Sequence, residues 1–532
     1  MSQRPPAIIT RRDFIYRVSR YGGAAAMTAM LGLDLMAKEI PKKPLLTGRA
    51  RAGKNRIIIL GAGLAGLSAA YELGKLGYEC TILEPRQRAG GRCWTIRRGD
   101  RETEVGGTEQ VCRFDRGNFM NPGPTRIPGH HEITLDYCRE FNVPLQVFTN
   151  VNESAFLHRD GFPVMRWRDA KADYRGYTSE LLAKAVNKGA LDKPLTAEDR
   201  DKLIAYLRDQ GGLNNDLLYA GGATSSSGPG GEAVRRSFKQ APGAGDQPPI
   251  VTSPIDFETL IKSGFGGMYS NYYDIDQSPT MLTPVGGIDQ IAKAFESRVR
   301  RRIRYGAQVR EIRKTADGRV KIAYTDAGGA RLEANADFCI CTIPPVVLEK
   351  IPADFSKPFA EGIAAIGSFP VGKIGLQFKR RFWEQDDRIF GGISRTAQPI
   401  TQIIYPFDNY HGKTGVVIGY YNFGPDAAVF GAWPPAERER MALEQGAKIH
   451  PQYKEEFDNS FSVDWQRIRH NRSGWAGWNG DSRARYYKAL NESDGPIWLC
   501  GEGMSYIGGW MAGAFVSAHK VCQEIHARAT AA

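Results

Sequence analysis

The sequence predicts an α/β fold, because a strand, a glycine-rich turn and a helix follow one another near its start. The apolar run Arg56-Ile-Ile-Ile-Leu60 is typical of a buried parallel strand. The turn Gly61-Ala-Gly63-Leu-Ala-Gly66 follows at once, and helical periodicity continues to Leu76. Such glycines let backbone amides approach a pyrophosphate at a helix N-terminus. This order predicts a Rossmann-type dinucleotide-binding unit.

A carboxylate stands where a dinucleotide site needs one. The second predicted strand, Tyr78-Glu-Cys-Thr-Ile-Leu83, leads directly into Glu84. An acid about 20 residues beyond the glycines grips a ribose hydroxyl in such sites. An ordinary glycine-rich turn is the alternative, and it accounts for neither the second strand nor the acid.

The segment after the acid indicates which dinucleotide is bound. Arg88-Ala-Gly90-Gly91-Arg92 resembles the second phosphate-contacting segment of the flavin-containing amine oxidases. The resemblance implies that Gly91 lies along the cofactor and that Arg92 neutralises the pyrophosphate of FAD. Nicotinamide enzymes lack this segment, so FAD is the expected cofactor.

Length, charge and cysteine content exclude several classes of protein. A chain of 532 residues is too long for one core, so two or three domains are expected. The net charge is +13, but basic residues are dispersed except in Arg298-Val-Arg-Arg-Arg-Ile-Arg304, so no nucleic-acid partner is expected. Eight cysteines make no disulfide framework, and the histidines lack zinc-ligand spacing, so no metal is expected.

Residues 1–37 are expected to be an export signal rather than part of the fold. Thr10-Arg-Arg-Asp-Phe-Ile15 resembles the twin-arginine signal, and the apolar run from Gly22 to Leu35 is too short to span a bilayer comfortably. A chance arginine pair before an amphipathic helix is the alternative. The resemblance implies an exported protein, periplasmic or secreted, with the twin-arginine translocase as a partner. Residues 38–54 are expected to be a basic linker.

The remaining chain is expected to form two domains that interleave along the sequence. The full expectation is an α/β fold with a discontinuous Rossmann-type FAD-binding domain, plus a mixed α+β substrate domain with a helical subdomain. Residues 129–285 are expected to form the helical part of the substrate domain, and residues 346–489 its remainder. The FAD-binding domain is expected to comprise residues 55–128, 286–345 and 490–532.

The helical part contains two periodic segments, Ile133–Phe141 and Tyr177–Gln210. Within the second, Thr196-Ala-Glu-Asp has the pattern of a capped helix start. Glycine-rich stretches at residues 221–231 and 241–249 are expected to be loops. The sequence leaves the oligomeric state open, a homo-oligomer included.

One proline-rich loop indicates the substrate. Asn121-Pro-Gly-Pro-Thr125-Arg126-Ile-Pro128 resembles the loop along the flavin in the L-amino-acid oxidase branch of the family. The resemblance implies that Thr125 and Arg126 contact FAD and that the arginine clamps the substrate carboxylate. A guanidinium fork fits a carboxylate through two parallel hydrogen bonds, and a simple amine offers no such group. A surface arginine in a turn is the alternative.

Two strands carry the other expected substrate-side residues. Gly415-Val-Val-Ile-Gly-Tyr420 resembles the strand whose phenol donates to the carboxylate, although a strand tyrosine alone indicates core packing. Lys373 is the one lysine in the apolar segment Pro370–Phe378, and a buried lysine is costly without partners. The resemblance implies that Lys373 reaches the reactive flavin nitrogen through a water and helps oxygen react. A lysine snorkelling from an edge strand is the alternative.

The C-terminal segment from Gly501 to Met511 resembles the family's last flavin-binding motif. The resemblance implies that Glu502 and Met511 bind the cofactor. It also implies that Gly509 and Trp510 lie beside the substrate, with the indole as an aromatic wall.

Agreement with the family is looser elsewhere. Val309 matches the position whose backbone holds adenine, and the opposite aromatic wall is either Trp475 or Trp478. The segment Arg113–Phe119 replaces an aromatic-rich lead into the carboxylate loop. No histidine is placed as a general base, and three histidines are each expected to be solvated: His130, His131 and His158. No cysteine occupies the tail position used for covalent flavin, so non-covalent FAD is expected.

The resemblance implies oxidative deamination of L-amino acids to 2-oxo acids, ammonia and hydrogen peroxide, with molecular oxygen as the acceptor. No side-chain base is needed if the amine enters deprotonated, so activity is expected to rise toward alkaline pH. Three alternatives stay open: a monoamine or polyamine oxidase, a flavin monooxygenase acting on L-amino acids, and a flavin-binding protein without turnover. The sequence does not fix the preferred side chain.

Overall fold

The structure, a computed structural model, describes residues 45–49, 56–107, 109–190, 195–221, 235–247 and 249–531. The chain divides into two units, Met1–Thr47 and Gly48–Ala532, and the elements below belong to the second. The expected export signal (residues 1–37) and most of the expected linker (38–54) lie outside the described residues. Within the described part, no helix has both the length and the apolar character to cross a membrane.

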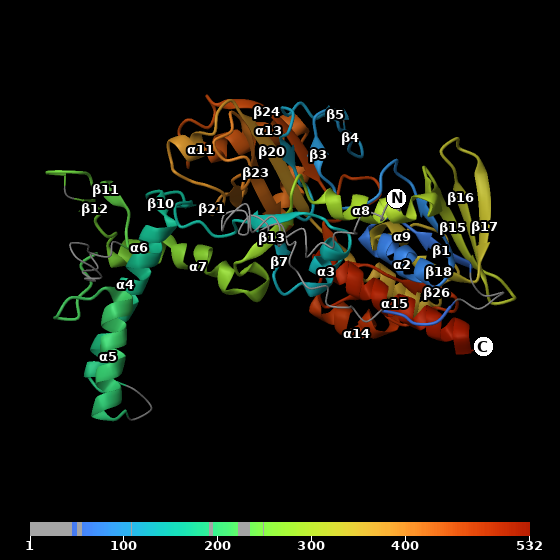
Figure 1. Ribbon diagram of the computed structural model, residues 1–532, viewed down its shortest axis with the longest axis horizontal. Coiled ribbons are helices and arrows are strands. Elements are labelled where there is room, and N and C mark those ends of the chain that lie inside the picture. Colours follow the sequence, from blue (N-terminus) through green and yellow to red (C-terminus); the bar gives the residue numbers. More distant parts are fainter. Residues whose placement is uncertain are drawn as a thin grey trace, which may run out of the picture. The chain divides into compact units, whose positions relative to one another are not determined.

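A five-stranded parallel sheet starts at the first predicted strand (Figure 1). Every strand pairing in it is parallel. Helix α2 (Leu64–Lys75) follows β1 and contacts both α8 (Asp289–Val299) and α15 (Met511–Ala531). This is the predicted discontinuous Rossmann-type arrangement. In sheet order the strands are β14 (Ile303–Tyr305), β2 (Glu79–Glu84), β1 (Arg56–Leu60), β18 (Phe338–Cys341) and β26 (Ile497–Leu499).

One core joins this sheet to a second, three-stranded antiparallel sheet and to three helices. The apolar strands leave their alternate side chains, such as Ile58 and Cys339, buried in that core. Leu348, Phe359 and Leu490 pack into the same core, so it extends past residue 345. The added elements are β15 (Gln308–Lys314), β16 (Val320–Thr325), β17 (Arg331–Ala336), α9 (Pro345–Leu348), α10 (Lys357–Ala364) and α14 (Gly480–Leu490).

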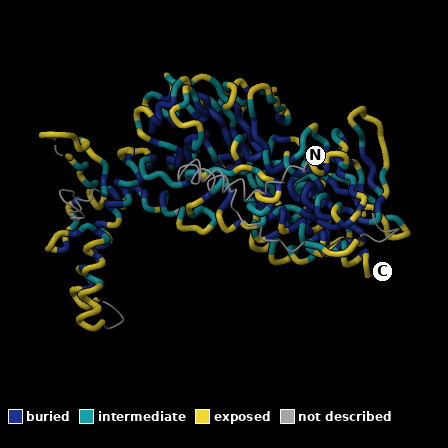
Figure 2. The backbone as a smooth tube through the Cα atoms, in the orientation of Figure 1, coloured by how far each residue is buried: buried dark blue, intermediate teal, exposed yellow. Residues whose placement is uncertain are grey.

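A seven-stranded sheet forms the other main layer of strands. Its pairings are antiparallel except that between β21 and β9. β20 is buried along its whole length, because strands flank both its edges and its side chains enter two apolar clusters. The central strands of this sheet are dark blue in Figure 2. In sheet order the strands are β10 (Met165–Arg166), β9 (Phe156–His158), β21 (Ile393–Thr396), β22 (Gln402–Ile404), β23 (Gly415–Phe423), β20 (Val371–Phe378) and β24 (Phe457–Asp464).

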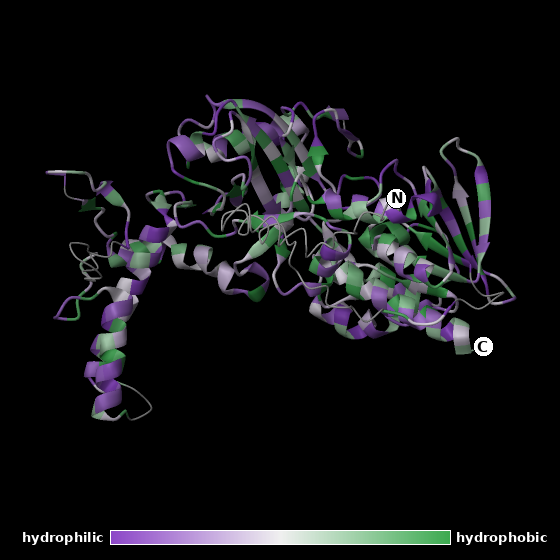
Figure 3. Ribbon diagram, in the orientation of Figure 1, coloured by the Kyte–Doolittle hydropathy of each residue, from purple (hydrophilic) through white to green (hydrophobic). Residues whose placement is uncertain are grey.

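The helical part centres on α4 (Trp167–Asn187) and α5 (Ala197–Gly211), which pack on each other through an apolar cluster that includes Val186 and Leu207. The predicted cap is confirmed, because the Thr196 side chain accepts a hydrogen bond from the backbone N–H of Asp199 at 3.1 Å. α5 is largely exposed in Figure 2 and mostly hydrophilic in Figure 3.

The other elements are short connections. The helices are α3 (Glu132–Glu140), α6 (Phe257–Ser263), α7 (Phe265–Tyr269), α11 (Phe382–Gln385), α12 (Gly424–Ala432), α13 (Pro435–Gly446) and the 3-10 turns η1 (Ser270–Tyr273), η2 (Ile275–Gln277), η3 (Arg300–Arg302) and η4 (Glu502–Met504). The strands are β3 (Ile96–Arg97), β4 (Arg101–Thr103), β5 (Glu109–Val111), β6 (Phe119–Met120), β7 (Ile127–Pro128), β8 (Leu145–Phe148), β11 (Phe238–Gln240), β12 (Ile250–Val251), β13 (Met281–Pro284), β19 (Gly367–Phe369) and β25 (Trp475–Gly477).

Candidate active site

A cavity of about 1060 Å³ runs from the carboxyl ends of β1 and β2 to the face of the seven-stranded sheet. Its lining includes Gly61 and Glu84 at one end and Tyr421 and Arg395 at the other. In open parallel sheets, ligands bind outside the carboxyl ends of the strands. The volume is at the upper limit for small-molecule pockets, which suits a dinucleotide together with a second, smaller ligand.

The three glycines after β1 have different structural roles. Gly61 has φ +107°, a backbone conformation that favours glycine, and it lines the cavity. Gly63 also lines the cavity, and a Cβ added there would meet nothing within 4 Å. Gly66 does not line the cavity: its added Cβ would lie 2.1 Å from the carbonyl oxygen of Gly61. The prediction that Gly66 touches the cofactor is therefore corrected, since it permits close helix–strand packing instead.

Glu84 is held at the cavity edge by backbone donors. It ends β2, is buried, and accepts hydrogen bonds from the backbone N–H groups of Ala62 at 2.9 Å and Arg86 at 3.0 Å. Val309, in β15, also lines this end of the cavity. The structure thus brings together the glycine turn, the ribose-binding candidate and the adenine-binding candidate.

Arg92 and Glu502 form an ion pair on the cavity wall. The guanidinium lies 3.0 Å from the carboxylate and also donates to the carbonyl oxygen of Gly474 at 2.7 Å. Glu502 accepts two further bonds, from the backbone N–H groups of Ala476 and Gly509. Because the carboxylate is held by backbone, it fixes the Arg92 guanidinium at the cavity, where it can face a phosphate.

The start of α15 lies at the same wall. Met511 is the first residue of this helix and lines the cavity, as do Gly509, Trp510 and Gly91. The positive end of the helix dipole therefore faces the cavity and stabilises negative charge there. Gly509 has φ +78°, which favours glycine at this turn.

Arg126 is a half-buried cation that lines the cavity and has no carboxylate partner among the described residues. Its Nη2 donates to the amide oxygen of Gln277 at 2.6 Å, and its Nε is buried without a hydrogen-bond partner. Phe148 packs below it, 5.6 Å from the guanidinium carbon to the ring centroid. Burial lowers the pKa of Arg126, yet the group stays charged at neutral pH. Such a guanidinium is poised to bind an anionic ligand.

Lys373 joins β20 to the loop that carries Arg126. Its Nζ donates to the carbonyl oxygens of Asn121 at 3.2 Å and Gly123 at 2.6 Å, and to Thr125 Oγ1 at 2.8 Å. Burial, with the charge of Arg126, holds its pKa well below the usual value. Lys373 is thus buried and hydrogen-bonded rather than snorkelling, which excludes that alternative.

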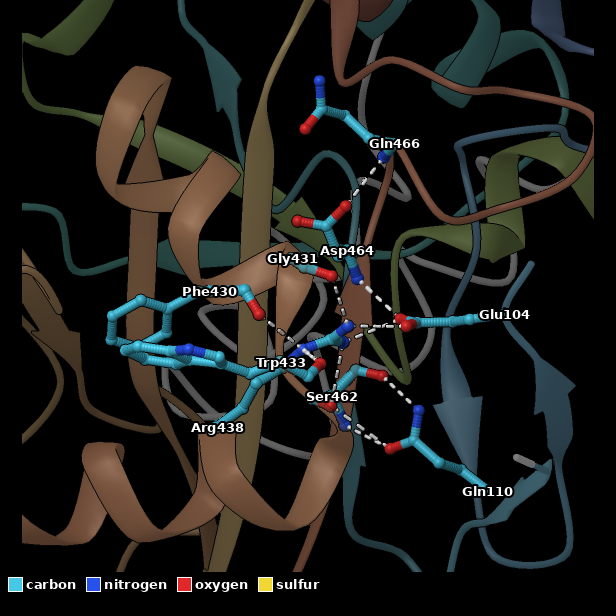
Figure 4. A network of polar contacts seen from close by, with 9 residues as sticks. All are labelled: Glu104, Gln110, Phe430, Gly431, Trp433, Arg438, Ser462, Asp464 and Gln466. Carbon is cyan, nitrogen blue, oxygen red and sulfur yellow. Dashed lines mark hydrogen bonds and ion pairs between the residues drawn. The ribbon is translucent and has the colours of Figure 1, made fainter. Parts of the chain in front are cut away.

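The structure contradicts the placement of Tyr420 at the substrate. Its side chain is fully buried on the other face of β23, against Phe430 with ring centroids 5.0 Å apart. Arg438 and Asp464 lie on that side, within a buried polar network (Figure 4). The adjacent residue, Tyr421, lines the cavity instead. Side chains alternate along a strand, so an error of one residue moves the phenol to the opposite face.

Of the two candidates for the aromatic wall opposite Trp510, Trp475 lines the cavity and stacks on Phe369, with ring centroids 4.6 Å apart. Trp478 is outside the lining and donates through Nε1 to the carbonyl oxygen of Gly503 at 2.8 Å. Within the described residues three indoles line the cavity, those of Trp465, Trp475 and Trp510.

Two histidines are buried rather than solvated, which corrects the expectation for His131 and His158. His131 meets Trp510 edge to face, with ring centroids 5.2 Å apart. Asp276 Oδ1 lies 2.9 Å from Nε2 of His130 and 3.3 Å from Nε2 of His131. Burial lowers the pKa of His131, with the neighbouring His130 adding to the effect. His130 and His131 thus support the wall behind Trp510 and the η2 turn that carries Gln277.

Sequence reasoning missed several residues that line the substrate half of the cavity. Each is an ordinary polar or aromatic residue in a short strand or turn, where the sequence pattern gives no sign of the cavity. For Tyr421, alternation with its neighbour could have raised the question of register. They include Gln277, Arg395, Gln402 and Tyr421.

Comparisons with known proteins agree with this site. The family model for flavin-containing amine oxidoreductases matches residues 64–526. The L-amino-acid oxidase BmooLAAO-I of Bothrops moojeni is 26% identical over 508 residues, covering 92% of this chain and 92% of its own. The flavin-dependent L-tryptophan oxidase RebO of Lentzea aerocolonigenes is 27% identical over 512 residues, covering 89% and 98%.

Solved structures share the fold. Cyclohexylamine oxidase from Brevibacterium oxydans IH-35A has a TM-score of 0.59 at 16% identity, covering 89% of this chain and 99% of its own. Wild-type putrescine oxidase bound to putrescine has a TM-score of 0.58 at 16% identity, with the same coverage. Non-covalent binding of FAD is typical of this family, and the glycine cradle, Glu84 and Arg92 fit that cofactor. The chain therefore belongs to the flavin-containing amine oxidoreductase family, with FAD as its cofactor.

Proposed function

We propose that this protein is an FAD-dependent oxidase of L-amino acids, which it converts to 2-oxo acids, ammonia and hydrogen peroxide. The observation that carries the proposal is the Arg126 guanidinium, which lines the cavity, has a buried Nε without a hydrogen-bond partner and has no carboxylate partner within the described residues. An α-carboxylate would pair with it through two charge-assisted hydrogen bonds. Relatives named as L-amino-acid oxidases support the same substrate class.

In this proposal Arg126 and Tyr421 bind the substrate carboxylate. The two side chains are near enough for the charge of Arg126 to lower the pKa of the phenol, which burial raises. The phenol O–H would therefore donate to the carboxylate beside the guanidinium. Trp475 and Trp510 would exclude water from the rest of the substrate. Fixing one end of the substrate orients its Cα–H bond, which is the main contribution of the protein to the rate.

The bound FAD supplies the redox chemistry, taking two electrons from the substrate and returning them to oxygen as hydrogen peroxide. The substrate loses its Cα hydrogen and one amine hydrogen, and the resulting imino acid is hydrolysed by water to the 2-oxo acid and ammonia. The amine would enter in its neutral form, so activity should rise toward alkaline pH. This rise in activity requires no side-chain base.

We also propose Lys373 as the positioning residue of the carboxylate loop. Its three donor contacts hold the segment from Asn121 to Thr125 immediately before Arg126. The expected part of Lys373 in the reaction of oxygen stays a prediction, as do the cofactor contacts of Thr125, Val309 and Met511.

The predicted domain division and the export route are further proposals. The five-stranded sheet supports the division, since it draws its strands from residues 55–128, 286–345 and 490–532. Its core, however, extends past the predicted boundary at residue 345 to Leu348 and Phe359. Export by the twin-arginine translocase rests on the sequence between residues 10 and 35 alone. Export should fail when Arg11 and Arg12 are both changed to lysine, and recovery of the folded double variant outside the cytoplasm would contradict this route.

Product analysis tests the proposed reaction against its rivals. With L-amino acids and oxygen, the purified holoenzyme should release hydrogen peroxide, ammonia and 2-oxo acid in equal amounts. Carbon dioxide and an amide in their place would identify the monooxygenase alternative. Faster oxidation of simple amines would identify an amine oxidase, the class to which the named structural neighbours belong. A yellow protein that none of these compounds reduces would leave only flavin binding.

A further inference from the structure

Arg395 is a second cation in the substrate half of the cavity. It stands in β21 and lines the same cavity as Arg126. Its Nε is buried without a hydrogen-bond partner, and no ion pair joins it to a carboxylate in the part of the chain that the structure describes. Burial and the charge of Arg126 lower its pKa to about 10, so it is still a cation at neutral pH.

Among the described residues two carboxylates line the cavity, and both are engaged at its cofactor end. Glu84 accepts backbone hydrogen bonds from Ala62 and Arg86, and Glu502 pairs with Arg92. Neither neutralises the cations of the substrate half. A buried charge without a partner costs free energy, so the arrangement favours a ligand that brings negative charge with it.

The sheet separates Arg395 from the site of the α-carboxylate. Arg395 pairs in register with Gln402 of β22, and β22 lies next to β23, which carries Tyr421. Strands in a sheet are about 4.8 Å apart, so the backbones at Arg395 and Tyr421 are about 10 Å apart. The charges of Arg126 and Arg395 act on each other, so a single carboxylate between Arg126 and Tyr421 brings one negative charge for two cations. A second carboxylate a few bonds farther along the same ligand would pair with Arg395.

We infer that the substrates of this protein are acidic L-amino acids, with Arg126 binding the α-carboxylate and Arg395 binding the side-chain carboxylate. The inference rests on the proposed oxidase function and adds the substrate class to it. Gln402 extends the site, because it lines the cavity beside Arg395 and its amide nitrogen donates to the carbonyl oxygen of Tyr421 at 3.2 Å. The Gln402 amide therefore fixes the strand between the two carboxylate sites.

Matched substrates of nearly equal size test this inference in the unmodified holoenzyme. L-Glutamate and L-glutamine differ at the side chain by a carboxylate against an amide, and L-aspartate and L-asparagine differ in the same way. A site built around a charged partner rejects the uncharged analogue, so kcat/KM for the better acid should exceed that for its amide by about 100-fold or more. Equal values, or a preference for the amides, would overturn the inference.

A variant assigns the preference to Arg395. Arg395→Met should lower kcat/KM for the acidic substrate by about 100-fold while changing the value for its amide by less than about threefold. Arg388→Met is the matched control, since Arg388 is exposed, precedes the same strand and does not line the cavity. An equal loss with acid and amide, or no loss with either, would overturn the assignment.

Ligand binding gives a readout that does not depend on turnover. Glutarate carries two carboxylates and butyrate carries one, and each can be titrated against the flavin absorbance of the holoenzyme. Arg395→Met should raise the Kd of glutarate at least tenfold and leave that of butyrate unchanged. Oxidation of neutral L-amino acids without oxidation of the acids would overturn this inference alone. Failure of every L-amino acid to reduce the flavin would overturn the proposed function as well.

Discussion

Lys373 and Tyr421 face each other across β20 and β23. They are register partners, and the Lys373 Nζ lies 4.1 Å from the centroid of the Tyr421 ring. Residues directly opposite in an antiparallel pair share one face of the sheet. That face borders the cavity, whereas Tyr420 pairs with Ile374 on the reverse face. The register of β23 therefore decides which of two adjacent tyrosines can touch a substrate.

Exchanging each phenol for a phenyl ring tests this register. Tyr421→Phe should lower kcat/KM for L-amino acids by about 10- to 150-fold, because one hydrogen bond to a charged group contributes about 1.5–3 kcal/mol. Tyr420→Phe, the matched control one residue away, should leave kcat/KM unchanged. Steady-state kinetics with one L-amino acid suffice. A loss in the Tyr420 variant without a loss in the Tyr421 variant would contradict the register.

Substitutions of Gly63 and Gly66, in the turn after β1, should cause different defects. Gly63→Ala should fold normally, since its φ is −70° and the added methyl meets nothing within 4 Å. The methyl would nevertheless point into the cavity, so FAD should bind more weakly. Gly66→Ala should lower the thermal midpoint even without FAD, because its methyl would lie 2.1 Å from the Gly61 oxygen. Flavin titration and thermal unfolding of the two apoproteins check these outcomes. A lower midpoint for Gly63→Ala, with weaker FAD binding only in Gly66→Ala, would contradict them.

Arg438 should contribute strongly to stability. It is buried, and its guanidinium contacts both oxygens of Glu104, at 2.8 and 2.6 Å (Figure 4). Removing one partner of a buried pair costs about 3–5 kcal/mol, because the other charge stays buried. Arg438→Met should therefore lower the free energy of unfolding by that amount. Arg440→Met, on the exposed side of the same helix, should change it little. Equal effects in denaturant unfolding would contradict this.

Asp464 should make stability depend on pH in an unusual direction. Burial, with the charge of Glu104, raises its pKa to about 7 despite the opposing charge of Arg438. An unfolded aspartate has a pKa of about 4, so between about pH 4 and 7 only the folded state keeps the proton. Folding is then disfavoured as pH rises through this window, by about 1.4 kcal/mol per pH unit.

The matched variant Asp464→Asn should remove this contribution to the pH dependence. Measured from pH 4 to 8, the thermal midpoint of the wild type should fall relative to that of the variant as pH rises. A difference that stays constant over the window would mean that Asp464 titrates alike in the folded and unfolded states.

Much of the fold could be predicted from local patterns. The run Arg56–Leu60, the glycines after it and Glu84 each have one physical explanation, and the structure places them together at one end of a parallel sheet. Thr196 is a comparable case, because an N-cap depends on residues three positions away. Such features are determined over short stretches of chain, so the sequence alone predicts them.

The substrate half of the cavity could be predicted only in part. Arg126 was found because its loop resembles one in a known family, while Arg395 and Gln402 come from short strands in a mixed sheet. Which face such strands turn to the cavity depends on register with strands far along the chain. The misplacement of Tyr420 has the same cause, since its local sequence suits either face.

Reduction of the flavin under anaerobic conditions tests the central claim, that Arg126 binds a substrate α-carboxylate. Each L-amino acid is compared with the amine that remains when its α-carboxylate is removed. The pairs are L-glutamate with 4-aminobutyrate, L-leucine with 3-methylbutylamine and L-phenylalanine with 2-phenylethylamine. For at least one pair the amino acid should reduce the flavin faster. Arg126→Gln should remove that advantage, because losing the charge pair weakens transition-state binding of the amino acid by about 2–5 kcal/mol. Arg116→Gln, at an exposed position, should keep the advantage. Equal or faster reduction by the amines in every pair, or an advantage that survives Arg126→Gln, would contradict the claim.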